Sequence, residues 1–146
     1  MVNMKIYLDN CCFNRPFDDQ SQLRIKLESE AKLKIQDDIR AERIQLVWSY
    51  ILDLENDNNP YDERRRQIGE WKIYSIFDVQ ENAEIVDTAK DLTSKGLRKL
   101  DALHIACAIF SQCEYFLTTD DKVLKKDYLV EELKIVDPFL FIKETE

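Results

Sequence analysis

The fold is decided by the stretch LRKLDALHIACAIFSQCEYFLTTDD, residues 97–121. Residues 97–112 form a nearly wholly apolar run of helical length, which predicts a helix that is buried on most of its faces. Residues 115–117 form a short apolar run that ends at Thr118, Thr119 and Asp120, which predicts a buried strand stopped by turn-forming residues. A buried helix followed directly by a buried strand indicates an α/β sheet.

The same alternation continues on both sides of this stretch. The predicted strands lie at residues 4–8, 45–48 and 134–136, with a strand or a loop at 76–79, and the predicted helices lie at 21–43, 50–55, 61–74, 81–94 and from about 122. Strands that alternate with helices favour a parallel sheet, because parallel neighbours need a crossover between them. We therefore expect one open α/β sheet.

Local signals set several boundaries of these elements. Ser49 is a good N-cap for the helix that begins at residue 50, and Asn58-Asn59-Pro60 should end that helix. Gly96 fits the left-handed position that follows a helix. A loop containing Arg15-Pro16 is expected before residue 21. The helix at 21–43 has an apolar stripe of residues four apart, formed by Leu23, Leu27, Ala31, Ile35 and Ile39.

Size and composition fit one domain spanning residues 1–146, since domains cluster at about 100–150 residues. The first apolar run is too short for a signal peptide and no run approaches the roughly 20 residues of a membrane span, so we expect a cytoplasmic protein without membrane contact. The four cysteines form neither a CxxC pair nor a zinc-finger spacing, and they are interpreted as buried reduced thiols.

The net charge of −8 argues against nucleic-acid binding, because nonspecific affinity for nucleic acid comes mainly from Lys and Arg that neutralise phosphates. A compensating arrangement has the acids converging on a metal pocket with basic residues around its rim. Basic runs that could supply such a rim occur at residues 64–66, 95–99 and 122–126.

Four acids are placed to meet at one edge of the predicted sheet. Asp9 and Asp120 directly follow strands, Glu55 follows a strand through less than two helical turns, and Asp101 opens the buried helix. In open parallel sheets the ligand site forms outside the carboxyl ends of the strands. Composition alone offers a simpler explanation, since 29 of the 146 residues are Asp or Glu and acids are common at turns. Asp101 fits that explanation worst, because a charge among apolar residues needs a partner.

A cluster of four carboxylates requires protons or a cation, because two carboxylates about 4 Å apart repel by roughly 4 kcal/mol at an effective dielectric near 20. Oxygen ligands favour hard ions, and Mg²⁺ or Mn²⁺ suits a site that must also accept phosphate oxygens. Such an ion lowers the pKa of a bound water and stabilises charge on the phosphoryl group. These residues therefore predict metal-dependent phosphodiester chemistry.

Across nearly the whole chain, the ordered motifs resemble the PIN-domain family. They are an apolar strand ending in Leu8-Asp9, Ser49 with Glu55 six residues later, DALHIACA at residues 101–108, and a strand ending in TTDD at residues 118–121. The last two are similar to the third and fourth acidic motifs of VapC-type toxins of bacterial toxin–antitoxin pairs. The resemblance implies a three-layer α/β/α fold with a central parallel sheet of about five strands.

The resemblance also implies a function and partners. It assigns Asp9, Glu55, Asp101 and Asp120 as catalytic, metal-binding acids, with Asp9 and Asp101 foremost as direct ligands. It implies Mg²⁺-dependent cleavage of single-stranded RNA, a homodimer, and inhibition by an antitoxin protein. Asp121 competes with Asp120 as the fourth acid, and Asp53 and Asp57 are weaker substitutes for Glu55.

Besides Asp121, four further residues are candidates for substrate contact or support. Asn10 stands where the family often has Thr or Ser, and its amide could hold a metal-bound water. Arg15 could reach a phosphate or an antitoxin carboxylate, and Thr118 could position Asp120 or touch phosphate. His104 lies on the helical face of Asp101 and invites an acid–base role, although packing in the buried helix is the preferred interpretation.

Other function classes fit the sequence less well. A receiver-type phosphoacceptor needs an acidic pair after the first strand, and a DxD phosphatase fails at the same position, because Asn10 and Cys11 follow Asp9. A catalytically silent PIN-like module that grips a basic partner remains as the alternative, and the net charge supports it. The metal-dependent ribonuclease is preferred.

Overall fold

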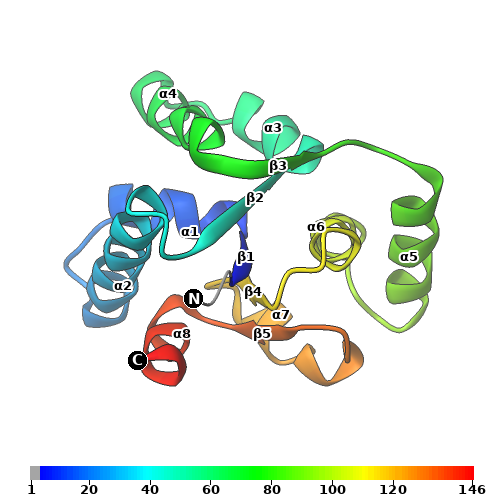
Figure 1. Ribbon diagram of the computed structural model, residues 1–146. Helices are drawn as coiled ribbons and strands as arrows, with labels where there is room; N and C mark the ends of the chain where they lie inside the picture. The colour runs from blue at the N-terminus through cyan, green and yellow to red at the C-terminus, as the bar shows by residue number, and fades with distance from the viewer. Residues whose placement is uncertain (1–3) are drawn as a thin grey trace.

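A computed structural model describes residues 4–146; residues 1–3, which begin the predicted domain, lie outside the described residues. Within the described part, all strands join one five-stranded parallel sheet in the order β3-β2-β1-β4-β5 (Figure 1). The strands are β1 (Lys5–Leu8), β2 (Gln45–Ser49), β3 (Ser75–Val79), β4 (Tyr115–Leu117) and β5 (Lys134–Val136). The predicted central sheet of about five parallel strands is confirmed, and residues 76–79 are strand rather than loop.

Helices cover both faces of this sheet. They are α1 (Asn10–Asn14), α2 (Leu23–Arg40), α3 (Tyr50–Asp57), α4 (Asp62–Glu70), α5 (Ala83–Ser94), α6 (Lys99–Phe110), α7 (Asp121–Leu124) and α8 (Pro138–Thr145), with 3₁₀ turns η1 (Arg15–Phe17), η2 (Trp71–Tyr74) and η3 (Asp127–Leu129). Figure 1 shows α2 and α8 on one side of the sheet and α5 and α6 on the other. This is the three-layer α/β/α arrangement that the sequence predicts.

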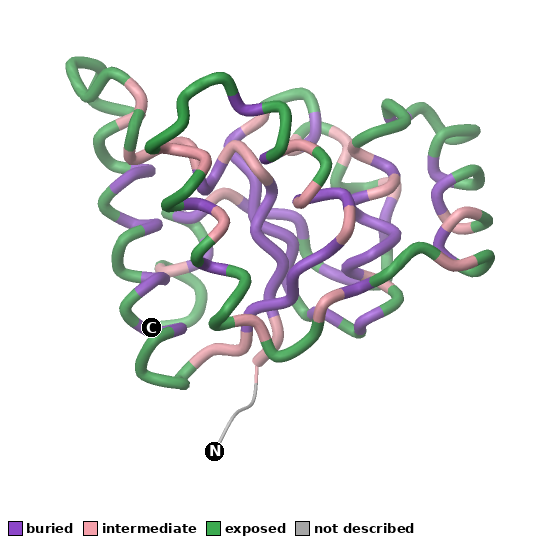
Figure 2. Tube along the Cα trace, turned by 90° about the horizontal axis from the view of Figure 1, so that it is seen from above, coloured by how far each residue is buried: buried purple, intermediate pink, exposed green. Residues whose placement is uncertain are grey.

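The hydrophobic core lies in the middle of the sheet, where Figure 2 shows the buried chain gathered. Ile6, Tyr7 and Leu8 of β1 are wholly buried, as are Phe116 and Leu117 of β4. Both faces of these central strands are covered, which explains why they read as continuous apolar runs rather than alternating ones. Burial of each large apolar side chain contributes roughly 1.5–3 kcal/mol, so the core holds the strand ends in fixed positions.

Helix α6 packs against the central strands as predicted, but its ends are less buried than expected. Ala102, Ala106 and Ala108 are buried, and their small side chains allow a close approach to the sheet. Leu100 and Phe110, near the two ends, are 40% and 37% exposed. The helix is therefore buried along its middle, which is where its polar residues need partners.

Two helical segments differ from the sequence predictions. The expected loop around Arg15 is α1 followed by η1, because the side chain of Asp9 caps α1 directly after β1. The last helix, α8, was not predicted. Its signal was present, since Asp137 caps the helix by accepting from the backbone N–H of Leu140 at 2.7 Å and Pro138 occupies the first position.

Helix α2 spans a shorter range than residues 21–43, and its apolar stripe is only partly buried. Leu23 and Leu27 are 70% and 39% exposed, because the first turns of the helix extend past the core. Its buried face instead includes Lys32, whose ammonium lies 5.0 Å from the ring centroid of Phe13 and 5.3 Å from that of Trp71. Burial lowers the pKa of Lys32 to about 7.

Local boundary signals are confirmed elsewhere. The Ser49 side chain accepts from the backbone N–H of Leu52 at 3.2 Å and so caps α3. Gly96 has φ of 120°, and the N–H groups of Gly96 and Leu97 close the end of α5 on the carbonyls of Thr93 and Leu92. The expected helix at residues 61–74 is α4 continued by η2.

All four cysteines are free thiols, as expected. Cys12, Cys107 and Cys113 are buried, and burial raises the pKa of Cys107 to about 12. Cys11 is only partly buried. Among residues 4–146, none of the helices has the length and apolar character needed to cross a bilayer.

Candidate metal centre

The sheet topology places two chain segments at the point where the strand order reverses. Strand β1 pairs with β2 on one side and with β4 on the other. Asp9 follows β1, and its backbone N–H donates to the carbonyl of Leu117 in β4 at 2.9 Å. Thr118 and Asp120 follow β4. Crevices at such reversal points, outside the carboxyl ends of the strands, are the usual ligand sites of open α/β sheets.

A pocket of 290 Å³ opens at this edge of the sheet. Its lining contains all four acids that the sequence singled out, and it is formed by Asp9, Cys11, Glu55, Arg98, Leu100, Asp101 and Asp120. These residues come from segments as far apart in sequence as the end of β1, which Asp9 follows, and the start of α7, which Asp120 precedes. The predicted meeting of the four acids at one edge of the sheet is therefore present in the structure.

Asp9 is the most buried of the four acids, with 7% of its surface exposed. Its Oδ1 accepts from the backbone N–H of Asn10 at 2.8 Å, and its Oδ2 accepts from the Thr118 hydroxyl at 2.8 Å. Burial raises the pKa of Asp9 above its usual value, against the opposing effects of His104 and the Thr118 hydrogen bond. The ionised form of Asp9 is thus only partly compensated by its surroundings.

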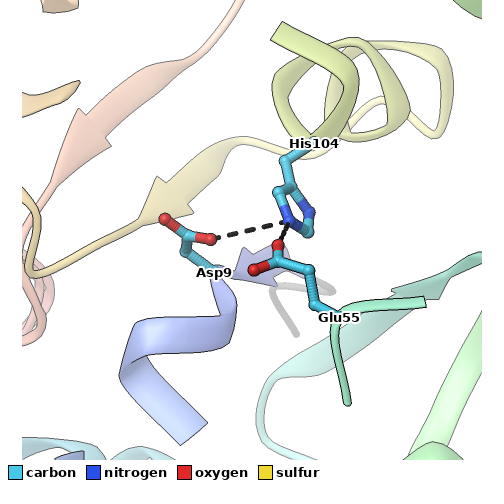
Figure 3. Close-up of side chains that lie close together, drawn as sticks. All are labelled: Asp9, Glu55 and His104. Carbon is cyan, nitrogen blue, oxygen red and sulfur yellow. Dashed lines mark hydrogen bonds and ion pairs between the residues drawn. The ribbon is translucent and has the colours of Figure 1, made fainter. Parts of the chain in front are cut away.

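Glu55 and His104 complete a tight group with Asp9 (Figure 3). The His104 Nε2 atom contacts Glu55 Oε1 and lies 3.8 Å from Asp9 Oδ1. One oxygen or nitrogen atom from each residue lies within 4.8 Å of the others. Asp9, Glu55 and His104 are called the inner half of the site below.

A buried chain of hydrogen bonds holds the His104 ring from behind. Its Nδ1 lies 2.5 Å from the Tyr7 hydroxyl, which lies 2.6 Å from the Ser49 hydroxyl. Tyr7 belongs to β1 and Ser49 ends β2, and both side chains are fully buried. The orientation of the imidazole is therefore fixed by the core of the sheet.

Asp101 and Asp120 lie beside this group and share a different partner. The Arg98 guanidinium donates from Nε to Asp101 Oδ2 at 2.8 Å and from Nη2 to Asp120 Oδ2 at 2.6 Å. The side chains of Arg98 and Asp120 are 52% and 33% exposed. Arg98, Asp101 and Asp120 are called the outer half below. Its two carboxylates are already paired with a positive charge.

The inner half fits a divalent cation. Two carboxylates and one imidazole are common ligands for divalent metals, and their spacing allows one ion to touch all three. Burial raises the pKa of Asp9, so a cation bound beside its carboxylate would stabilise the ionised form. In addition, the Asn10 Oδ1 atom is buried without a hydrogen-bond partner among residues 4–146.

A family model described as PIN domain matches residues 6–128. The chain belongs to the PIN-domain family. The match covers every residue of the inner and outer halves. A comparison with curated protein sequences finds none that matches significantly.

The fold of this PIN domain is similar to a solved toxin–antitoxin structure. The structure is that of VapBC2 from Rickettsia felis bound to a DNA fragment from their promoter, with a TM-score of 0.58 at 12% identity. The alignment covers 90% of this chain and 97% of that chain. At this identity the similarity supports the fold and not the chemistry.

The structure separates Asp120 from its neighbour. Asp120 lines the pocket, whereas the carboxylate of Asp121 accepts two hydrogen bonds of 2.8 Å from the Arg24 guanidinium. Hydrogen bonding to Arg24 lowers the pKa of Asp121. Only Asp120 of this pair faces the other acids.

The same distinction applies to the substitutes for Glu55. Asp53 accepts from the Trp48 indole N–H at 2.8 Å and from the Lys72 ammonium at 3.1 Å, and Asp57 is exposed at the end of α3. Glu55 alone among these three lines the pocket.

The remaining candidates occupy different surroundings. The Asn10 amide donates to Glu55 Oε2 at 3.4 Å, and Thr118 donates to Asp9, so both support the inner half. Arg15 instead pairs with Glu28 at 2.9 Å and Asp18 at 3.3 Å, and it does not line the pocket.

The contacts that two residues of the site make were not predicted from the sequence. His104 is packed in the buried helix and hydrogen-bonded, as the sequence favoured, and its Nε2 atom in addition lies against Glu55 and Asp9. Its spacing of three residues from Asp101 was the available signal. Arg98 belongs to the basic run at residues 95–99, one of three runs expected to supply the rim of the acidic pocket, and it does line that pocket. Its contact with Asp120 spans 22 residues, which no local pattern encodes.

Proposed function

We propose that this PIN domain is an endoribonuclease that depends on Mg²⁺ or Mn²⁺, cleaves single-stranded RNA, and acts as the toxin of a VapBC-type pair. The observation that supports it most is the gathering of Asp9, Glu55, Asp101 and Asp120 in one pocket at the strand-order reversal. Four carboxylates in a pocket of this size disfavour an anionic substrate unless a cation binds with it.

Each half of the site has a distinct task in this proposal. Asp9 and Glu55 hold the cation, with Thr118 and Asn10 orienting their carboxylates through the hydrogen bonds described above. When bound, the ion acts as a Lewis acid that lowers the pKa of water and offsets charge on the phosphoryl oxygens.

In the outer half, Arg98 is the basic group closest to the pocket. Its Nη1 atom has no hydrogen-bond partner among residues 4–146, so it is available to donate to a phosphate oxygen. Asp101 and Asp120 fix the guanidinium plane through two separate nitrogens. This positioning places one positive charge at the mouth of an otherwise acidic pocket.

A protein partner follows from the same proposal. The solved neighbour is a VapBC complex, and by analogy we propose that a small antitoxin binds this chain and blocks the pocket. A homodimer and a cytoplasmic location stay predictions. Coexpression with the product of a neighbouring small open reading frame, followed by copurification and light scattering, tests the partner and the dimer together.

The nuclease activity is tested with purified protein and a labelled single-stranded RNA. Cleavage should require Mg²⁺ or Mn²⁺, stop with a chelator, resume when the ion is restored, and disappear in Asp9→Asn. Sequencing of the product ends identifies the cleaved position. Cleavage that persists in Asp9→Asn, or that survives the chelator, would contradict the proposal.

One observation favours a second candidate, a PIN-like module that binds a partner without catalysis. Arg98 already pairs with both Asp101 and Asp120, so half of the acids have a basic partner within the chain. Calorimetric titration separates the two candidates. Binding of Mn²⁺ or Mg²⁺ at or below about millimolar concentration supports the nuclease, because catalytic Mg²⁺ sites work with few protein ligands. Lack of binding supports the module.

A further inference from the structure

His104 is packed in the core, and its Nε2 atom has the environment of a metal ligand. Its Nε2 atom faces Glu55 Oε1 in direct contact and Asp9 Oδ1 at 3.8 Å. Ligand atoms that share an ion at about 2.0–2.2 Å are separated by roughly 3–4 Å from one another. Only a small shift of Glu55 is needed to open a position between all three residues.

The contacts at the other ring nitrogen point to the same role. Histidine ligands are usually oriented by a hydrogen bond at the nitrogen that does not bind the metal. Here Nδ1 meets the Tyr7 hydroxyl at 2.5 Å, and Tyr7 meets Ser49 at 2.6 Å. In the tautomer that carries its proton on Nδ1, this nitrogen donates to Tyr7, Tyr7 donates to Ser49, and the lone pair of Nε2 faces the two carboxylates, as a metal ligand requires.

We infer that His104 is a nitrogen ligand of the inner half, and that this site consequently binds Mn²⁺ and related transition-metal ions in preference to Mg²⁺. The inference rests on the proposed metal-dependent function and narrows the identity of its ion. It concerns a residue outside the four acids that the family resemblance assigns.

The donor set supplies the physical reason for this preference. Mg²⁺ strongly prefers oxygen ligands, whereas first-row transition-metal ions also accept an imidazole nitrogen, and their affinity for such a mixed site rises from Mn²⁺ through Fe²⁺ to Co²⁺. The outer half offers few compensating oxygens, because the Oδ2 atoms of Asp101 and Asp120 accept from Arg98. The inner half therefore presents two oxygens and one nitrogen to an ion.

The sequence makes a direct spectroscopic test possible, since His104 is the only histidine in the chain. Mn²⁺ is added to the full chain without a histidine tag, and pulsed electron paramagnetic resonance is used to look for ¹⁴N coupling of the imidazole type. The wild type should show this coupling. His104→Gln, which keeps a polar group of similar length but offers a hard amide oxygen, should lose it.

Affinities measured by calorimetry provide the second readout. In His104→Gln the Mn²⁺ dissociation constant should rise by about 100-fold, the upper end of the losses seen when even outer-shell partners are removed, while that of Mg²⁺ should change by less than about fivefold. Tyr7→Phe is the matched control for the outer shell. It should keep the ¹⁴N coupling and weaken Mn²⁺ binding only about tenfold. Circular dichroism and thermal melting verify that each variant folds.

Several outcomes would overturn the inference. Bound Mn²⁺ without ¹⁴N coupling, equal losses of Mn²⁺ and Mg²⁺ affinity in His104→Gln, or no Mn²⁺ binding at all each exclude His104 as the ligand. These results are separable from the nuclease assay. RNA cleavage with Mg²⁺ and no ¹⁴N coupling would leave the proposed function intact, and ¹⁴N coupling without RNA cleavage would leave the ligand assignment intact.

Discussion

The two halves of the pocket carry similar acids but balance their charges differently. In the inner half, Asp9 is buried beside the His104 imidazole, which also contacts Glu55. In the outer half, Asp101 and Asp120 share the guanidinium of Arg98 near the surface. A carboxylate that is buried without full compensation needs a proton or an external cation, whereas one that is paired and partly solvated does not. The inner half is therefore the expected position of the ion, and the outer half is the expected phosphate-facing edge.

The largest expected difference between the halves is in catalysis. Asp9→Asn should lower kcat/KM for RNA cleavage by about 1000-fold. The variant loses the metal, which stabilises charge in the transition state by several kcal/mol, and each 1.4 kcal/mol or so corresponds to a factor of about ten. Asp120→Asn should lower kcat/KM by only about tenfold, which corresponds to about 1.4 kcal/mol of transition-state stabilisation. Steady-state cleavage of one RNA by both variants measures the ratio. Equal losses would remove the distinction between the halves.

The next effect concerns the number of ions bound. Arg98→Gln frees the carboxylates of Asp101 and Asp120, and their repulsion should then be relieved by a second ion. We expect one Mn²⁺ per chain in the wild type and two in Arg98→Gln, measured by equilibrium dialysis with elemental analysis. Lys99→Gln removes a neighbouring exposed charge and serves as the control. A stoichiometry of one in Arg98→Gln would show that the outer half does not bind metal even when Arg98 is absent.

A smaller effect is expected on the stability of the metal-free protein. The pKa of Asp9 is raised in the folded state by burial. As the pH rises through the unfolded pKa of about 3.9, the unfolded chain loses this proton first, so the contribution of Asp9 to the free energy of unfolding falls until the folded pKa is passed.

Asp9→Asn cannot ionise, so it avoids the loss of stability that the wild type undergoes when the buried Asp9 carboxyl ionises. At pH 7 and without metal, Asn at this position should raise the free energy of unfolding by about 1 kcal/mol, the usual size of a single-residue effect. The gain should vanish below pH 4 and should reverse when Mn²⁺ is added, because only the wild type binds the ion tightly. Urea unfolding at pH 3.5 and pH 7, with and without Mn²⁺, provides the measurement. A destabilised Asp9→Asn at pH 7 without metal would contradict this view of the inner half.

The smallest effect is expected next to the outer half. Asp121→Asn breaks an exposed pair with Arg24 and leaves the pocket lining unchanged. RNA cleavage by this variant should stay within about twofold of the wild type, since isolated surface pairs have little effect. A loss as large as that of Asp120→Asn would mean that Asp121 shares the function of the fourth acid.

Much of the fold was predictable because its signals are local. The apolar runs that became β1, β4 and α6, the Ser49 cap and the left-handed Gly96 each depend on a few adjacent residues. The failures have physical causes as well. The α2 stripe begins with Leu23 and Leu27, which periodicity assigns to the core but which are exposed in the structure. Short helices such as α1 lack a periodic pattern.

The sequence by itself determined which acids follow which strands, and the parallel order of strands then brought Asp9, Glu55, Asp101 and Asp120 to one edge. Only the tertiary structure decided how those acids are paired. The Arg24 guanidinium that engages Asp121 is 97 residues away in sequence, and the Tyr7 hydroxyl that fixes His104 is 97 residues away as well. Such pairings depend on distances between packed elements, which propensity and spacing do not specify. Long-range packing therefore assigned His104 to the inner half and Arg98 to the outer half.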